Sequence, residues 1–352
     1  KKKKALNIHL PEYDGVSNKN PQKININYKK ARFLFFKTAS IDKEFKISIL
    51  PWPAPNSEIT RQTILSNALS NTSIYNIENK KITFKKGKYQ TSKDIIIPAG
   101  YTVEFKAGHK LNLTDSAKFI SFSPVYMNGN STEPIHIFSS DHTAKGFSVL
   151  LNGQESTLKY VNFNGFGTLD EGTWYLTGAV TFYKTKLDMQ YCKIDSNHCE
   201  DALNTINSEI TVKNCIISNT YSDGFDSDFC TGTIEKCTLY NTGNDALDFS
   251  GSKVNISNCK LDNIGDKGIS CGEESSINVD SIDISNAVWG VASKDLSKLD
   301  IKNSTINTCQ IGLNAFVKKP EYGGATIKSK SIKLIDVDTI KSKDKYSSIF
   351  LD

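Results

Sequence analysis

A repeat of 22 residues is the feature that most restricts the fold of this chain. Small residues recur at this spacing without insertion or deletion, at Ala202, Gly224, Ala246, Gly268, Gly290 and Gly312. The residue after each of them is apolar: Leu203, Phe225, Leu247, Ile269, Val291 and Leu313. A fixed period in this range indicates a solenoid, because one repeat cannot bury its own apolar face and must stack on its neighbours.

Short runs within each repeat, such as residues 209–212 and 253–257, alternate apolar and polar side chains. Alternation with a period of two predicts β-strands. Stacking at an inter-strand spacing of ~4.8 Å would pair the backbone of each coil with the next. The sequence pattern of leucine-rich repeats is missing. We therefore predict an all-β fold, a right-handed parallel β-helix of 22-residue coils over residues 80–352.

Residues 1–79 lack this period. Within them, residues 29–53 predict two strands that end at a Pro-Trp-Pro break, and residues 56–68 predict a short helix. We expect this region to cap one end of the solenoid, because an open coil edge invites edge-to-edge association. The segment after Gly324 continues the alternation and is expected to close the other end.

Two further columns are expected to follow the coil period. Asparagines at 197, 219, 241 and 263 are predicted to hydrogen-bond along the stack and to satisfy a turn. Three of the eight cysteines, Cys215, Cys237 and Cys259, are 22 residues apart. No CxxC pair suggests a zinc site, so we favour buried, reduced thiols over disulfides or metal ligands.

Composition excludes several classes of function. No apolar run approaches the ~20 residues that span a bilayer. The net charge is +5, but lysines and acidic residues are interspersed, so we expect no nucleic-acid partner. The start at Lys1–Lys4 has no apolar stretch of a signal peptide, as expected of a mature or trimmed form. We take a monomer as the default state.

Acidic residues break the symmetry of the repeat. The residue before each small residue is Asp201, Asp223, Asp245, Lys267, Trp289 and Ile311, and the second residue after it is Asn204, Asp226, Asp248, Ser270, Ala292 and Asn314. Because the apolar column points inward, strand alternation should turn the second of these columns outward. The first column, just before the small corner residue, is expected to project outward from the turn. Four aspartates, Asp223, Asp226, Asp245 and Asp248, are then expected to crowd one patch, and Asp201 and Asp228 are candidates to join them.

The electrostatic repulsion among these carboxylates must be offset by a positive charge. Two carboxylates ~5 Å apart repel by roughly 3 kcal/mol at an effective dielectric constant of about 20. Lys267 is one candidate counter-charge, and a bound Ca²⁺ is the other, because an all-oxygen site suits calcium. Alternatively, the aspartates serve the turns and Lys267 caps their ladder with a salt bridge. We favour a binding site, because the small corner residue would leave room for a ligand.

The motifs at this patch resemble those of a known group. Asp-Gly-Phe-Asp at 223–226, Asn-Asp-Ala-Leu-Asp at 244–248 and Gly-Asp-Lys-Gly at 265–268 resemble calcium-dependent pectate lyases that use a lysine as base, within the bacterial pectate-lyase-like β-helix proteins. The resemblance implies a secreted or cell-surface polysaccharide lyase that acts on an acidic extracellular polysaccharide by β-elimination. It implies Asp223, Asp226, Asp245 and Asp248 as Ca²⁺ ligands and Lys267 as the proton abstractor. Its lysine base would need a lowered pKa.

Flanking residues would complete such a site. Lys294, Lys318 and Lys319 could hold an anionic chain, while Trp289 and Tyr322 could stack on sugar faces. Each has a plainer interpretation, with the lysines solvated and Trp289 packed at a corner.

Departures from related families keep alternatives open. The only arginines, Arg32 and Arg61, precede the solenoid, so an arginine base is unavailable. Residues 265–272 resemble a polygalacturonase stretch, but Lys267 replaces its second carboxylate; residues 221–228 resemble mannuronan epimerases without their histidine. A uronate C5-epimerase or a glycoside hydrolase is therefore one alternative, and a non-catalytic, glycan-binding or structural cell-surface or coat-type β-helix is another. His198, near Asp201 in sequence, is a lone histidine at a corner.

Overall fold

The computed structural model describes residues 33–38, 41–48, 70–171 and 174–352. Its contacts divide the chain into two units, Lys1–Ser66 and Asn67–Asp352. In the first unit, β1 (Phe33–Thr38) pairs antiparallel with β2 (Ile41–Ser48), which confirms the predicted strand pair. The helix predicted at 56–68 lies outside the described residues. The role of residues 1–79 as a cap stays a prediction.

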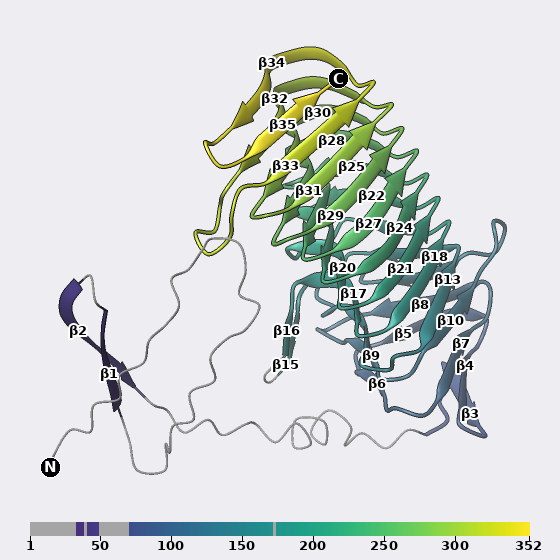
Figure 1. Ribbon diagram of the computed structural model, residues 1–352. Coiled ribbons are helices and arrows are strands. Elements are labelled where there is room, and N and C mark those ends of the chain that lie inside the picture. Colours follow the sequence, from purple (N-terminus) through teal and green to yellow (C-terminus); the bar gives the residue numbers. More distant parts are fainter. Residues whose placement is uncertain (1–32, 39–40, 49–69, 172–173) are drawn as a thin grey trace, which may run out of the picture. The chain divides into compact units, whose positions relative to one another are not determined.

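The second unit is a solenoid with three rows of strands (Figure 1). One row forms a sheet of its own, here called the first sheet. It contains β3 (Tyr75–Glu78), β4 (Lys81–Phe84), β7 (Thr102–Phe105), β10 (Val125–Asn128), β13 (Glu155–Lys159), β18 (Lys186–Gln190), β21 (Glu209–Lys213), β24 (Thr231–Glu235), β27 (Lys253–Ser257), β29 (Ser276–Asp280), β31 (Lys298–Lys302), β33 (Thr326–Lys330) and β35 (Ser348–Leu351). Its strands are parallel except for β3, which runs antiparallel along the edge of β4.

The other two rows belong to one large sheet. The second row contains β5 (Gly87–Thr91), β8 (His109–Leu113), β11 (Ile135–Phe138), β14 (Val161–Asn164), β19 (Lys193–Asp195), β22 (Ile216–Thr220) and β25 (Thr238–Thr242). The third row contains β6 (Ile95–Ile97), β9 (Phe119–Ser121), β12 (Phe147–Leu150), β17 (Gly178–Tyr183), β20 (Asp201–Ile206), β23 (Asp223–Asp228) and β26 (Leu247–Ser250).

Towards the C-terminus these two rows become continuous. The long strands β28 (Lys260–Gly272), β30 (Asp283–Lys294), β32 (Thr305–Phe316) and β34 (Lys333–Lys343) each supply both rows of one coil. A short antiparallel hairpin, β15 (Leu169–Glu171) and β16 (Trp174–Leu176), projects before β17. The segment after Gly324 continues the β-structure, as predicted. No helix among the described residues has the length and hydropathy of a membrane span.

The predicted apolar column lies in the core. Leu203, Phe225, Leu247, Ile269, Val291 and Leu313 pair in register on successive strands, and all are buried. Because strands in contact lie ~4.8 Å apart, each of these side chains packs directly on the next. The predicted 22-residue coil is therefore confirmed over this stretch.

The small-residue column also faces inward, contrary to our expectation that it leaves room for a ligand. A Cβ added to Gly268 would lie 2.6 Å from the carbonyl oxygen of Gly290 and 2.6 Å from Cγ2 of Ile284. Ala202 and Ala246 are fully buried. These residues are small because two rows of the coil meet there.

The asparagine ladder is confirmed for three of its four members. The side-chain amide of Asn263 donates to Asn241 (2.8 Å), and that of Asn241 donates to Asn219 (2.9 Å). All three have a left-handed backbone, which asparagine tolerates. Asn197 does not join them, because Ile194 pairs with Ile217 and places Ser196 beside Asn219 instead. The amide of Asn197 bonds Cys199 O at 2.8 Å.

The cysteine prediction is also confirmed. All eight cysteines are free and buried. Cys237 and Cys259 are stacked, with the backbone N–H of Cys237 3.4 Å from the Cys259 sulfur. Burial raises the pKa of Cys199 to about 12, so this thiol stays protonated.

Candidate functional site

The acidic residues lie along the third row, where Asp226, Asp228 and Asp248 are partly exposed. The corner residues Asp201, Asp223 and Asp245 are buried, contrary to the expectation that they project outward. Register pairs Asp201 with Asp223, and Asn204 with Asp226 and then Asp248. We call the group Asp201, Asp223, Asp226, Asp228, Asp245 and Asp248 the acidic face. The expected placement of these aspartates on one side of adjacent strands is what the structure shows. Their chemical roles stay predictions.

The corner carboxylates of Asp223 and Asp245 hold the turns together. Asp223 Oδ1 accepts the backbone N–H of Asp245 (2.9 Å) and the amide of Asn244 (2.7 Å). Asp245 Oδ1 accepts the backbone N–H of Lys267 at 3.0 Å. Each carboxylate thus satisfies the backbone of the next coil, so turn chemistry accounts for these two residues.

Lys267 completes this ladder as a cation. Its ammonium lies 3.2 Å from Asp245 Oδ1 and also pairs with Asp266. Burial alone would lower the pKa of Lys267, but the carboxylates of Asp245 and Asp266 outweigh it and raise that pKa. The expectation of a lowered pKa is wrong in this arrangement, and the base role of Lys267 stays a prediction without support from its surroundings.

Unlike Asp223 and Asp245, the carboxylates of Asp226 and Asp248 accept no backbone N–H group from the next coil in the described part of the chain. Asp226 Oδ2 accepts the amide of Asn204 at 3.0 Å, and Asp248 Oδ1 accepts the adjacent N–H of Phe249 at 3.0 Å. The ammonium of Lys294 lies 3.9 Å from Asp248 Oδ1. These two carboxylates are therefore free to act on a ligand.

Burial and mutual repulsion raise the pKa values of Asp223, Asp226 and Asp228. Burial, followed by the charges of Asp201 and Asp228, raises the pKa of Asp226 well above its usual range. Burial and a neighbouring carboxylate raise the pKa of Asp223 to about 7, and burial with the charges of Asp248 and Glu273 raises that of Asp228 to about 6. Near neutral pH the acidic face therefore carries both carboxylates and carboxylic acids.

A preformed calcium site is not part of this arrangement. The all-oxygen donor set suits Ca²⁺. In the described ranges, however, no three His, Cys, Asp or Glu side chains are placed to hold a metal ion. Oδ1 of Asp223 and Oδ1 of Asp245 already accept backbone N–H groups. The residues as arranged do not fit a bound calcium ion, and calcium stays a prediction.

The predicted substrate-binding residues divide into two groups. Lys294 is buried beside Asp248, and Trp289 lies in the corner column, with the ammonium of Lys267 5.3 Å from the centre of its ring. Lys318 is in the turn after β32, where its backbone N–H bonds Asp295 Oδ1 at 2.6 Å. The backbone N–H of Tyr322 donates to Lys319 O at 3.0 Å in the same turn.

Sequence reasoning missed three contributors to the site. Glu273 pairs with Lys319, and its charge raises the pKa of Asp228. Tyr183 pairs in register with Ile206, which pairs with Asp228, so this tyrosine lies two strands from the acidic face. Trp174 of the β15–β16 hairpin meets Tyr183 edge-on, with ring centres 6.3 Å apart. The alternation of residues along β17 could have identified Tyr183 as an outward side chain. The β15–β16 hairpin lies outside the repeat, so its sequence gives no such signal.

His198 does not turn towards Asp201. Its Nε2 lies 2.9 Å from Nδ1 of His142, and the two rings meet edge-on. A partner 56 residues away in sequence could not be found from the repeat alone.

Stability should fall as the pH rises through the range in which these aspartates titrate. Burial raises the pKa of Asp201 and of Asp223 to about 7, whereas an unfolded aspartate titrates near ~3.9. Between these values the folded state binds more protons than the unfolded state, so the free energy of unfolding falls with pH. Urea unfolding should give a value at least about 1 kcal/mol lower at about pH 8 than at about pH 5. Equal or greater stability at the higher pH would contradict the raised pKa values.

Comparisons with known proteins give one family match and several similar solved structures. The family model for the right-handed β-helix region matches residues 201–337, which confirms the predicted hand. No curated protein sequence matches the chain. Similar solved structures include the alginate lyase from Paenibacillus sp. str. FPU-7, at 10% identity and a TM-score of 0.43 over 74% of this chain and 99% of that chain. Another is the pectate lyase Pel9A, at 12% identity and a TM-score of 0.41 over 75% of this chain and 80% of that chain. A double mutant of the periplasmic alginate epimerase AlgG matches at 8% identity and a TM-score of 0.48, over 82% of this chain and 83% of that chain.

Proposed function

We propose that this right-handed β-helix is a carbohydrate-active protein that cleaves an acidic polysaccharide at its acidic face, with coupled aspartates as the acid and the base. The observation that carries the proposal is the raised pKa of Asp226, caused by burial and by the neighbouring aspartates. A carboxyl group that stays protonated near neutral pH can donate its proton to a leaving oxygen. Its neighbours supply the carboxylate that such chemistry also needs.

The spacing of the aspartates suits glycoside hydrolysis. Asp226 and Asp248 lie on adjacent paired strands whose backbones are ~4.8 Å apart, and Asp226 and Asp228 are two residues apart on one strand, with Cα atoms about 7 Å apart. Retaining hydrolases place their carboxyl groups ~5–5.5 Å apart and inverting ones roughly 6.5–9.5 Å apart. Asp226 would protonate the glycosidic oxygen, and Asp248 or Asp228 would act on the sugar carbon or accept a proton from water.

The flanks of the acidic face suit a glycan chain. Trp174 and Tyr183 present aromatic surface on the side of the earlier coils, and the exposed Lys319 supplies a cation on the side of the later coils. Aromatic rings stack on the apolar faces of sugars, and ammonium groups pair with acidic substituents. A polysaccharide lying along the solenoid would meet both.

Calcium-assisted β-elimination with Lys267 as base is the second candidate. Its support is the crowding of six aspartates on one face, which a divalent cation would relieve. Against it stand the raised pKa of Lys267 and the use of Asp223 and Asp245 in the turns.

The products separate these candidates. Incubation with a panel of acidic polysaccharides should release new reducing ends without the ultraviolet absorbance of an unsaturated uronate, and Ca²⁺ should raise neither the rate nor the melting temperature. An unsaturated product that requires Ca²⁺ and disappears in Lys267→Ala would replace hydrolysis by elimination. Binding without either product would leave a non-catalytic glycan-binding protein.

A further inference from the structure

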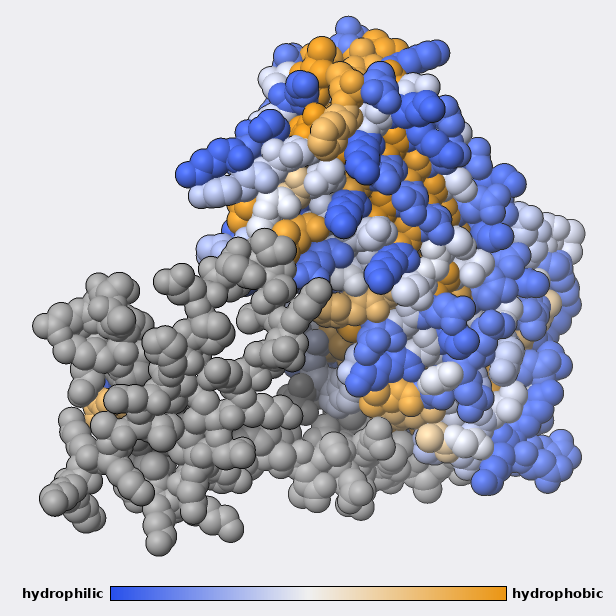
Figure 2. Space-filling model, viewed as in Figure 1, coloured by the Kyte–Doolittle hydropathy of each residue, from blue (hydrophilic) through white to orange (hydrophobic). Residues whose placement is uncertain are grey.

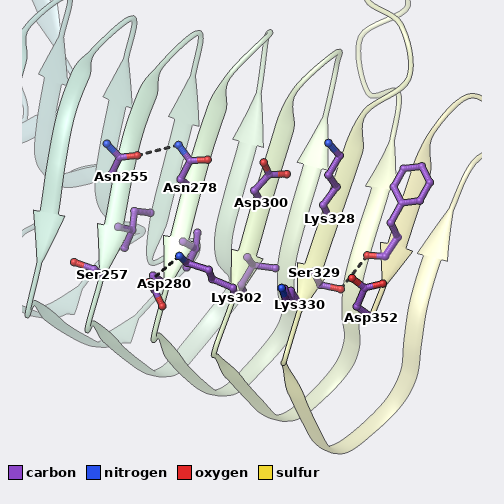
Figure 3. Close-up of a pocket in the computed structure, with 14 residues that line it drawn as sticks. Asn255, Ser257, Asn278, Asp280, Asp300, Lys302, Lys328, Ser329, Lys330 and Asp352 are labelled. Atoms are coloured by element: carbon purple, nitrogen blue, oxygen red, sulfur yellow. Dashed lines mark hydrogen bonds and ion pairs between the residues drawn. The ribbon is translucent and has the colours of Figure 1, made fainter.

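A second groove lies on a different wall of the solenoid from the acidic face. It occupies the outward side of the first sheet, over β27, β29, β31, β33 and β35, and encloses about 630 Å³ (Figure 3). Pockets for small ligands generally measure ≈ 300–1,000 Å³. The first sheet faces the viewer in Figure 2, where hydrophilic side chains are interspersed with apolar ones. Nothing in the proposed cleavage chemistry uses this wall.

One column of side chains runs the length of the groove. Register pairs Asn255 with Asn278, Asn278 with Asp300, Asp300 with Lys328, and Lys328 with Phe350. We call these five residues the groove column. Strand alternation turns them all outward, and all five side chains are exposed. The column therefore offers amides, a carboxylate, an ammonium group and an aromatic ring at a regular spacing of ~4.8 Å.

Three charged side chains of the groove remain unpaired in the described part of the chain. Within the described ranges, the side chains of Asp300, Lys328 and Lys330 have no hydrogen bond or ion pair. Lys330 belongs to the parallel row beside the column, in which Lys302 pairs with Asp280 at 3.2 Å (Figure 3). Asn278 donates to Asn255 at 2.9 Å, which leaves the Asn278 carbonyl oxygen available as an acceptor.

We propose that the groove column binds an extended acidic oligosaccharide that lies along the solenoid axis. Lys328 of the column and Lys330 of the row beside it are two residues apart on one strand and would pair with a uronate carboxylate. Asp300 and the two asparagine amides would bond sugar hydroxyls, and the ring of Phe350, which is 58% exposed, would stack on a sugar face. Because the strands are ~4.8 Å apart, successive side chains of the column would contact successive parts of an extended polymer. The groove would hold the polysaccharide whether or not the acidic face cleaves it.

Calorimetric titration of the full chain tests this site. The protein carries Asp226→Asn, so that cleavage does not consume the probe, and the probes are oligogalacturonate, oligomannuronate, a neutral malto-oligosaccharide and poly-glutamate. Lys328→Ala and Phe350→Ala should each weaken binding of a uronate oligosaccharide by about tenfold. Lys298→Ala is the matched control, because Lys298 is exposed on the same sheet at the start of β31 but does not line the groove. It should change the Kd by less than about twofold.

Each other result overturns the proposal. If Lys328→Ala and Phe350→Ala bind the uronate oligosaccharide as the parent does, the ligand binds elsewhere. If the neutral sugar binds as tightly as the acidic ones, the lysines do not recognise an anion. If poly-glutamate binds and the oligosaccharides do not, the groove recognises acidic peptides. A loss of cleavage at the acidic face would leave these titrations unchanged, so the two sites are tested separately.

Discussion

Asp226→Asn is expected to reduce cleavage of the polysaccharide by about 10²–10⁴-fold, the usual contribution of a general acid. Burial and the charges of Asp201 and Asp228 keep a proton on Asp226 in the range where cleavage is proposed to occur. An asparagine has the same shape and can still bond Asn204, but its amide cannot transfer a proton to a leaving oxygen. The measurement is the rate of release of reducing ends.

The fold should survive this substitution. Asparagine is neutral, as the protonated Asp226 is, and it cannot ionise beside the neighbouring aspartates, so the free energy of unfolding should stay equal or rise. Asp283→Asn, an exposed aspartate at the start of β30, is the matched control and should keep full activity. If Asp226→Asn cleaves as fast as the parent while Asp248→Asn does not, the proton comes from another member of the acidic face.

Phe225→Ala is expected to lower the free energy of unfolding by about 3–5 kcal/mol. Phe225 is 1% exposed and pairs in register with Leu203 on one side and Leu247 on the other. Truncation would leave a cavity between two coils, and the rigid strand spacing limits how far they can close it. Urea unfolding monitored by circular dichroism gives the change.

Phe229→Ala serves as its control. Phe229 is only four residues further along the chain but is 64% exposed, so its loss should change the free energy of unfolding by less than about 0.5 kcal/mol. Similar losses for the two variants would contradict the inward placement of the apolar column. A selective loss in Phe225→Ala would support the stacked core beneath the acidic face.

The placement of the acidic face could be predicted because strand alternation and the coil period decide it. Asp226 and Asp248 are 22 residues apart and follow an inward residue by one position, so they must face outward on adjacent strands. The same arithmetic failed at Asn197, because the segment between Asp195 and Asp201 is one residue longer than its counterpart in the next coil, which places Ser196 beside Asn219. A column is thus predictable only as far as the period is unbroken.

The chemistry of each carboxylate could not be predicted in the same way. Asp223 and Asp226 are the same residue type three positions apart, yet one accepts the N–H of Asp245 and the other meets only the amide of Asn204. Lys267 follows Asp245 in the corner column, and the ammonium bends back onto it and onto Asp266. That contact reverses the direction of the pKa shift on which a lysine base depends.

The sequence by itself determined the 22-residue coil, the inward apolar column and the shared side of the aspartates, because period and alternation decide which residues stack and which way they point. Only the tertiary structure decided which carboxylates hold the turns and which remain free for a substrate. It also brought Tyr183 and the β15–β16 hairpin to the flank of the acidic face. Those outcomes depend on the burial of each charge and on the N–H groups of the next coil, which act across space rather than along the repeat.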